Sequence, residues 1–128
     1  MAVADPFESL GLRLGHVFRD AALLEQALTH SSFANEHPGT RDNGALAFLG
    51  DAVLTPKRAA LVSGANLCRW AVTLGLGPAL RLGRGEEQMG GRERESLLAT
   101  ALEAVLAVVY LEGGLEAGRR AVASLAMW

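Results

Sequence analysis

Two apolar stretches of this chain each contain a single acidic side chain. Asp51 lies within residues 45–54 and Glu103 within residues 97–111, and most neighbours in both stretches are aliphatic. A carboxylate removed from water is costly unless a cation, a hydrogen-bond donor or a proton compensates it. Two such acids suggest a shared divalent cation, which prefers oxygen ligands. The alternative is that each acid caps a backbone group or pairs with an arginine such as Arg58 or Arg69.

The spacing around these acids sharpens the hypothesis. On a helix, Ala47 lies four residues before Asp51 and Thr100 lies three residues before Glu103, so each shares a face with its acid. Carboxylates at both partner positions would complete a four-acid pocket for a hard divalent ion. Here one position carries a methyl group and the other a neutral hydroxyl, so the sequence supplies half of that pocket.

The elements that must position these acids are predicted to be helices. The composition is 50% hydrophobic and only 5% aromatic, and its abundant Ala and Leu are strong helix formers, so we expect an all-α fold. Helices are predicted at 5–15, 21–30, 45–54, 63–73, 96–113 and 115–127, with a new start at Thr55-Pro56. The expected N-caps are Asp5, Thr55, Ser63 and Ser96. Residues 37–44 are predicted to form a loop, and 83–95 a mobile surface loop.

Composition also limits the functional classes. The length of 128 residues fits one domain, and the single cysteine, Cys68, allows no intramolecular disulfide, which favours a reducing, cytoplasmic setting. We expect no leader and no membrane span. The net charge of −2 argues against a strongly basic RNA-binding surface, so any RNA binding must use local patches.

Several ordered segments resemble the nuclease domain of ribonuclease III, and the likeness runs from about Leu10 to the C-terminus. They are ALTHSS at 27–32, LAFLGDAVL at 46–54, RAALVS at 58–63, LGLG at 74–77, LRLGRGEE at 80–87 and LEAVLAVVYLEGG at 102–114. The resemblance implies the all-α ribonuclease III fold and Mg2+-dependent cleavage of double-stranded RNA for RNA processing. It also implies a homodimer.

The resemblance assigns roles to particular residues. Asp51 and Glu103 match two of the family's four catalytic, metal-binding acids, whereas Ala47 stands where the family has a glutamate and Thr100 where it has an aspartate. Phe48 matches a residue at the two-fold dimer interface, although a core phenylalanine is the alternative interpretation. His30 and Ser31 match scaffold residues near a helix end rather than a catalytic pair.

A second departure from the family is an internal deletion. Leu54 runs directly into Thr55, which matches sequence that follows about one further helix in the family. We therefore expect a single domain, residues 1–128, abbreviated by about one helix and lacking the double-stranded-RNA-binding domain that often follows. The copy is expected to be weakly active or inactive, a pseudoenzyme. The alternatives are a noncatalytic RNA-binding or assembly subunit, of the ribosome-associated type, or a protein-interaction module.

Other chemistry-bearing residues have structural interpretations. Cys68 is expected to be a small, half-buried residue, and Trp70 a core residue rather than a base-stacking platform. The arginines of residues 81–94 are interleaved with glutamates, so they form no strongly basic patch. The RNA-contacting residues are not identified by the sequence.

Overall fold

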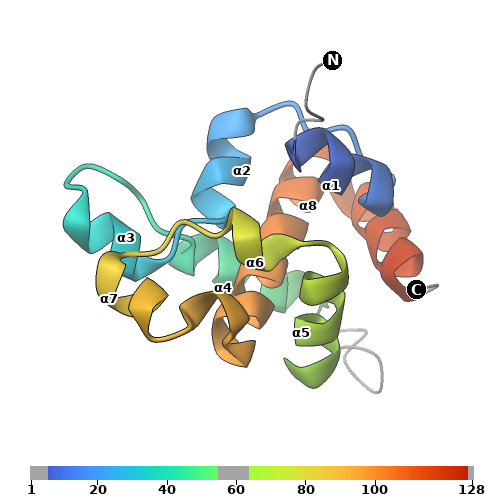
Figure 1. The fold of residues 1–128 in the computed structure, drawn as a ribbon. Coiled ribbons are helices and arrows are strands. Elements are labelled where there is room, and N and C mark those ends of the chain that lie inside the picture. Colours follow the sequence, from blue (N-terminus) through green and yellow to red (C-terminus); the bar gives the residue numbers. More distant parts are fainter. Residues whose placement is uncertain (1–5, 55–63, 127–128) are drawn as a thin grey trace, which may run out of the picture.

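The chain folds around one long helix. The computed structural model describes residues 6–54 and 64–126 (Figure 1). In these ranges the elements are α1 (Pro6–Leu14), α2 (Ala21–Ala27), α3 (Ser31–Glu36), α4 (Gly44–Leu54), α5 (Gly64–Thr73), α6 (Leu76–Ala79), α7 (Arg84–Gln88), the 3-10 helix η2 (Gly91–Glu93) and α8 (Glu95–Ala126). The described residues contain no strand, only an isolated bridge between Thr29 and Arg81. The predicted all-α fold is confirmed.

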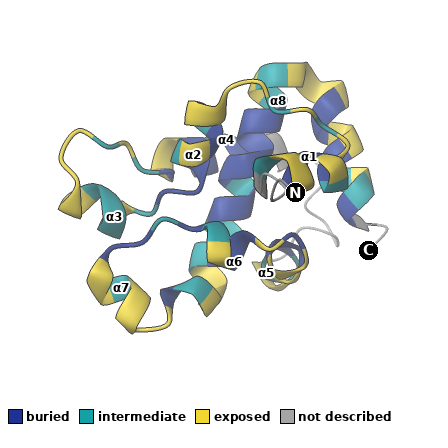
Figure 2. Ribbon diagram, turned by 45° about the horizontal axis from the view of Figure 1, so that its top comes forward, coloured by how far each residue is buried: buried dark blue, intermediate teal, exposed yellow. Residues whose placement is uncertain are grey.

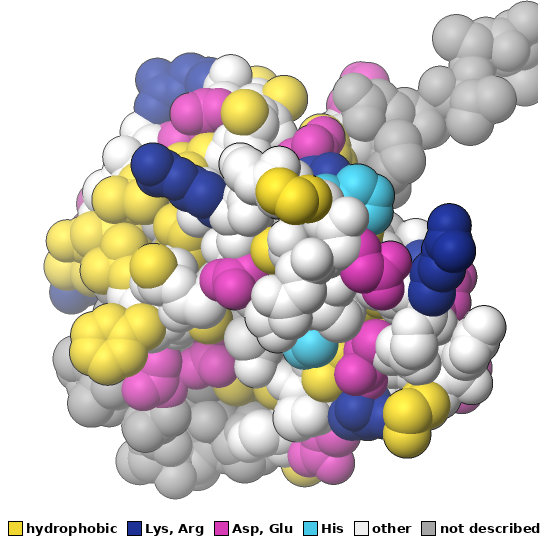
Figure 3. All heavy atoms as spheres, turned by 90° about the vertical axis from the view of Figure 1, so that its left-hand side faces the viewer, with side chains coloured by type: hydrophobic (Ala, Val, Ile, Leu, Met, Phe, Trp, Pro, Cys, Tyr) yellow, Lys and Arg dark blue, Asp and Glu magenta, His cyan; other side chains and the backbone are white. Residues whose placement is uncertain are grey.

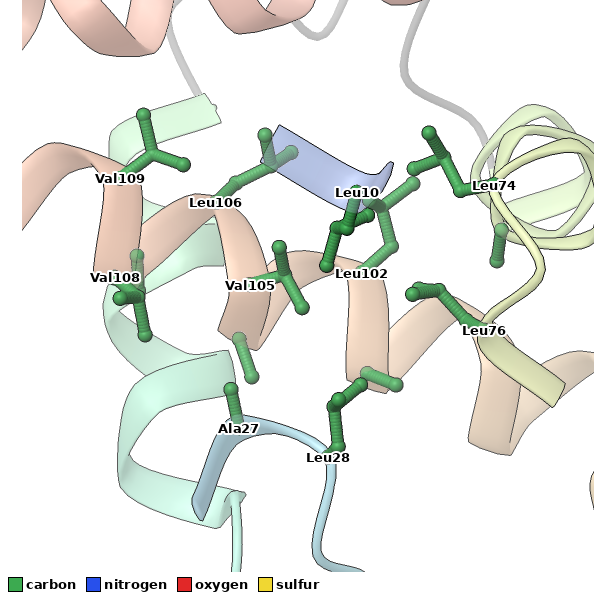
Figure 4. Packing of buried hydrophobic residues seen from close by; sticks show 14 of the residues in the cluster. Leu10, Ala27, Leu28, Leu74, Leu76, Leu102, Val105, Leu106, Val108 and Val109 are labelled. Atoms are coloured by element: carbon green, nitrogen blue, oxygen red, sulfur yellow. The ribbon is translucent and has the colours of Figure 1, made fainter. Parts of the chain in front are cut away.

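Helix α8 occupies the centre of the core. It packs against α4 and α5 and also contacts α1 and α2, and Figure 2 shows its buried surface enclosed by these helices. Leu102 and Val105 of α8 face Leu10 of α1 and Leu28, the residue after α2 (Figure 4). By length and a mean hydropathy of 1.6 this helix could cross a membrane, but 56% of the apolar window lies buried inside the fold. The apolar composition of α8 is therefore explained by its position in the core of the fold.

A sharp kink divides α8. Gly114 has φ 76° and ψ −168°, a conformation that glycine adopts at little cost because it has no Cβ. The helix therefore changes direction there, and residues 115–126 form a separate last segment. This confirms the prediction of a helix end at Gly113-Gly114 followed by a final helix.

Several predicted boundaries were wrong. Helix α2 ends at Ala27 instead of residue 30, because His30 begins the next helix: its Nδ1 accepts a hydrogen bond from the amide of Ser32 and caps α3. Helix α8 already begins at Glu95, so Ser96 lies inside it and is not its cap. The expected caps Asp5, Thr55 and Ser63 lie outside the described residues.

The segment 83–95, predicted to be a mobile surface loop, contains α7 and η2 instead. Arg92 holds it in place, because its guanidinium donates to the carbonyl oxygens of Gly77 at 3.0 Å and Leu80 at 2.6 Å. Arg94 pairs with Glu86. The alternating charges are therefore used within the segment, and the cost of ordering it is offset by these contacts.

Glu112 ties the end of the first α8 segment to the connection between α1 and α2. Its side chain, 8% exposed, lies 2.8 Å from His16 Nε2. Its carboxylate also accepts hydrogen bonds from the amides of Arg19 at 3.1 Å and Asp20 at 2.8 Å. Burial raises the pKa of Glu112, but the hydrogen bonds from His16, Asp20 and Arg19 outweigh burial and hold the pKa below its ordinary value of 4.5.

Replacing Glu112 with glutamine is expected to lower the free energy of unfolding by about 2 kcal/mol at pH 7, because His16 and the amides of Arg19 and Asp20 lose a charged acceptor. Since the folded pKa is lowered, the carboxylate's contribution is complete above the unfolded pKa and is lost as pH falls through the folded pKa. The difference between variant and wild type should therefore shrink in acid. Urea unfolding at pH 7 and at lower pH measures it.

Glu116→Gln is the matched control for this prediction. Glu116 lies on the same helix, is 83% exposed and approaches Arg119 only at 3.4 Å. Its substitution should change the free energy of unfolding by less than about 0.5 kcal/mol. Equal effects of the two substitutions at pH 7 would show that the Glu112 contacts do not stabilise the fold.

Candidate active site

Helices α4 and α8 cross in backbone contact where the two predicted acids lie. A Cβ atom added to Gly50 would lie 1.9 Å from the carbonyl oxygen of Glu103, so only glycine permits this approach. Asp51 is the next residue along α4. The crossing therefore brings the backbone of Glu103 against the residue that precedes Asp51, while the convergence of the two carboxylates on a metal ion stays a prediction.

By helical spacing, Ala47 shares a face of α4 with Asp51, and Thr100 shares a face of α8 with Glu103. Ala47 is 8% exposed and presents only a methyl group. Thr100, like Asp51 and Glu103, is half-buried. Both acids already have polar or electrostatic partners in the protein. The alternative that protein groups hold these acids therefore stays open beside the cation hypothesis.

The donor set does not fit a resident metal ion. Among residues 6–54 and 64–126, no group of three or more His, Cys, Asp or Glu side chains is placed to hold one. Mg2+ can bind through one or two carboxylates when substrate phosphates supply further oxygens. Asp51 and Glu103 could provide these two carboxylates, but the site would still need substrate phosphates to bind Mg2+.

A cavity of about 300 Å³ opens beside the crossing, at the N-terminal ends of α4 and α8. It is lined by His30, Ser31, Asp42, Asn43, Gly44, Ser96, Leu97 and Thr100. Asn43 fixes one wall, because its amide N–H donates to the Thr29 oxygen at 2.8 Å and its Nδ2 to the Ala27 oxygen at 3.0 Å. Neither Asp42 nor Ser96 was assigned to a functional site from the sequence. The polar residues just before α4 were the available signal.

Phe48 lies on the outer face of α4 and is 80% exposed. The core interpretation of this residue is therefore wrong. Ala45 and Ala52, three residues before it and four after it, are also exposed, so α4 presents an apolar stripe to solvent. Such a stripe next to a candidate site is typical of an interaction surface.

The remaining candidates have structural positions. His30 caps α3 and Ser31 begins it, which agrees with a scaffold role. Trp70 is 3% exposed and Cys68 half-buried, as predicted. Basic and acidic side chains are interspersed over the face shown in Figure 3, without a broad basic patch.

Comparison with known proteins decides the family. Residues 54–127 match the family model described as ribonuclease-III-like. The nuclease domain of ribonuclease III from Campylobacter jejuni superposes with a TM-score of 0.83 at 33% identity, covering 97% of this chain and 96% of that one. The chain belongs to the ribonuclease III family. A further structure of the Campylobacter jejuni ribonuclease III domain, described for flexibility in a region involved in dimer formation, has a TM-score of 0.82 at 34% identity, covering 94% of this chain and 96% of that chain.

Curated ribonuclease III proteins are also close in sequence. Ribonuclease 3 of Symbiobacterium thermophilum is 45% identical over 129 residues, covering 85% of this chain and 54% of that protein. Ribonuclease 3 of Heliobacterium modesticaldum is 45% identical over 138 residues, covering 91% and 59%. The chain therefore spans a little over half the length of these ribonuclease III relatives.

These comparisons bear on the predicted deletion. The 129 aligned residues exceed 85% of this chain, which is about 109 residues, so the Symbiobacterium thermophilum ribonuclease contains residues that this chain lacks. This difference in length is what an internal deletion in this chain would produce, while the position of the missing piece stays a prediction.

Proposed function

We propose that this ribonuclease III domain binds double-stranded RNA as a homodimer and cleaves it slowly or not at all. The observation that carries the proposal is the composition of the α4–α8 crossing: Asp51 and Glu103 remain, but a buried Ala47 methyl and the Thr100 hydroxyl stand in the other two positions. In the family, Mg2+ supplies an activated water and stabilises charge that develops on the phosphate. This chain supplies two carboxylates, those of Asp51 and Glu103, that could bind Mg2+.

The loss of two negative charges weakens any cation at the crossing. A threonine hydroxyl is a neutral and poorer ligand for Mg2+ than a carboxylate, and alanine supplies no oxygen. A bound RNA phosphate could complete the shell of an ion held by Asp51 and Glu103. The chain's own residues would then hold the ion only weakly. We therefore expect the protein to retain RNA binding while RNA cleavage is slow or absent.

The homodimer is supported by the apolar outer face of α4. Phe48 at 80% exposed is a large unburied side chain, and its burial against a second copy would remove apolar area from water. A two-fold dimer through this face would place two crossings near one another along a duplex. The chain itself carries a net charge of −2, so RNA affinity is expected to depend on local contacts.

A gel-shift titration with a duplex RNA of about 24 base pairs, together with analytical ultracentrifugation, tests this proposal. We expect a dimer whose RNA affinity falls by roughly tenfold or more between low and physiological salt. Phe48→Ala should give a monomer with weaker RNA binding. Met89→Ala is the control, because it removes another exposed apolar side chain, one that is 74% exposed. It should leave the oligomeric state and the RNA affinity unchanged. Absence of RNA affinity at low salt would contradict the proposal and favour a protein-interaction module.

A further inference from the structure

The cavity beside the α4–α8 crossing, here called the Thr100 cavity and lined as described above, has polar groups besides Thr100 that the metal hypothesis does not use. Hydroxyls of Ser31, Ser96 and Thr100 come from two different helices, and Asp42 and His30 come from the segments before α4 and α3. Groups from separate elements that converge on one hollow are typical of a small-ligand site.

The contacts of His30 fix its tautomer. The amide N–H of Ser32 donates to His30 Nδ1 at 3.1 Å, so Nδ1 must be unprotonated. The Ser32 hydroxyl lies 2.8 Å from the same nitrogen and accepts from the amide of Gly83. The neutral ring therefore carries its proton on Nε2, which has no hydrogen-bond partner among the described residues. His30 can offer that N–H to a ligand.

Asp42 supplies the opposite kind of group. Its Oδ1 accepts the amide N–H of Gly44 at 2.9 Å, which leaves the second carboxylate oxygen able to accept from a ligand. Among the described residues that line the cavity, Asp42 is the only acid and there is no Lys or Arg. The cavity thus combines one strong acceptor with several neutral donors.

These groups select among ligand classes by charge. A phosphate seated inside the cavity would be repelled by Asp42, and a divalent cation would find one carboxylate where it needs several oxygen ligands. An apolar ligand would leave the hydroxyls and Nε2–H without partners. A neutral ligand bearing hydroxyl groups satisfies both the acceptor and the donors.

We propose that the Thr100 cavity binds a ribose of an RNA strand, with the 2′-hydroxyl donating to Asp42 and accepting from His30 Nε2–H or the Thr100 hydroxyl. This inference rests on the proposed RNA-binding function and deepens it. The 2′-hydroxyl is both donor and acceptor, and it distinguishes RNA from DNA. Leu97 supplies an apolar surface for the sugar ring. Thr100 lies one helical turn from Glu103, so a ribose here would bring its backbone beside the former metal site.

The test compares a duplex RNA with a duplex DNA of the same sequence, for wild type, Thr100→Val and Asp42→Asn. Thr100→Val keeps the side-chain shape and removes the hydroxyl, while Asp42→Asn keeps an oxygen for Gly44 and removes the charge. Each is expected to reduce the ratio of RNA to DNA affinity by about fivefold to tenfold, the loss of one hydrogen bond. The ratio cancels any general effect of charge on nucleic-acid binding.

Thr73→Val is the matched control, because Thr73 is an exposed helical threonine whose hydroxyl bonds the Arg69 carbonyl, outside this cavity. It should leave the ratio unchanged, and thermal unfolding confirms that each variant folds. A second arm titrates uridine and 2′-deoxyuridine into labelled wild-type protein and follows amide NMR shifts. Shifts at cavity residues with uridine alone support the ribose site.

The outcomes separate the two proposals. An unchanged affinity ratio in Thr100→Val and Asp42→Asn overturns the ribose assignment while RNA binding itself stands. Uridine shifts without any duplex affinity support a ribose site for free nucleosides and contradict the proposed RNA function. Absence of both uridine shifts and RNA preference overturns the cavity proposal outright.

Discussion

Restoring the two missing acids, with Ala47→Glu and Thr100→Asp together, is expected to raise the rate of duplex RNA cleavage in Mg2+ by at least about 100-fold over the wild-type chain. The reason is that two added carboxylates at the α4–α8 crossing would join Asp51 and Glu103 and hold the ion that activates water. A gain of 100-fold corresponds to only about 2.7 kcal/mol of barrier lowering. Single-turnover cleavage of end-labelled duplex RNA measures the rate.

The same variant should change the coupling between Mg2+ and stability. Four carboxylates at one crossing, with position 47 buried, repel one another without a cation, so the metal-free variant is expected to be less stable than wild type. Mg2+ at about 100 times its dissociation constant would return about 2.7 kcal/mol. A thermal shift with Mg2+ in the double variant alone is the expected result.

Ala65→Glu with Thr73→Asp is the matched control, because it adds the same two charges to exposed positions on α5. It should gain neither cleavage nor Mg2+-dependent stabilisation. If the restored variant folds but behaves like this control, the shortened scaffold does not hold α4 and α8 in a metal-binding arrangement, and the site assignment fails.

Gly50→Ala is expected to lower the free energy of unfolding by about 3 kcal/mol, because its Cβ would meet backbone that cannot move aside without separating the helices. The added atom would lie 1.9 Å from the Glu103 oxygen and 2.6 Å from its carbonyl carbon. For a domain of this size the midpoint of thermal unfolding should fall by roughly 10 °C. Differential scanning calorimetry measures both quantities.

Gly118→Ala is the control for that substitution. Gly118 lies in α8, and a Cβ there would meet nothing within 4 Å, so the variant should be as stable as wild type or more stable by about 0.5–1 kcal/mol. If Gly50→Ala unfolded at the same temperature as Gly118→Ala, the two acid-bearing helices would not be in backbone contact.

The sequence predicted the two helices that cross, because helix signals are local. Helix periodicity and glycine breaks identified α4 and the first part of α8, and the resemblance paired Asp51 with Glu103. The close approach at Gly50 could not be read from the pattern, since a glycine within a helix indicates only a lower propensity. The approach exists because the carbonyl of Glu103, far away in the sequence, occupies the space of a side chain.

The features that the sequence analysis predicted wrongly or did not identify share one physical cause, which is tertiary contact that overrides local propensity. The glycine-rich segment after Leu82 reads as a loop, yet Arg92 anchors it to the carbonyls of Gly77 and Leu80. Helix α3 begins at a histidine cap, a rare cap type that composition does not signal. The Thr100 cavity was missed because its walls come from segments that meet only in the folded chain.

The central claim is that the chain retains the ribonuclease III crossing with too few acids for efficient metal-dependent cleavage. Single-turnover incubation of the purified wild-type protein with long duplex RNA and Mg2+ tests it most directly, with Glu103→Ala alongside. We predict that RNA is bound and that cleavage is slow or absent, with little difference between the two proteins. Robust cleavage by the wild type that Glu103→Ala abolishes would contradict the claim.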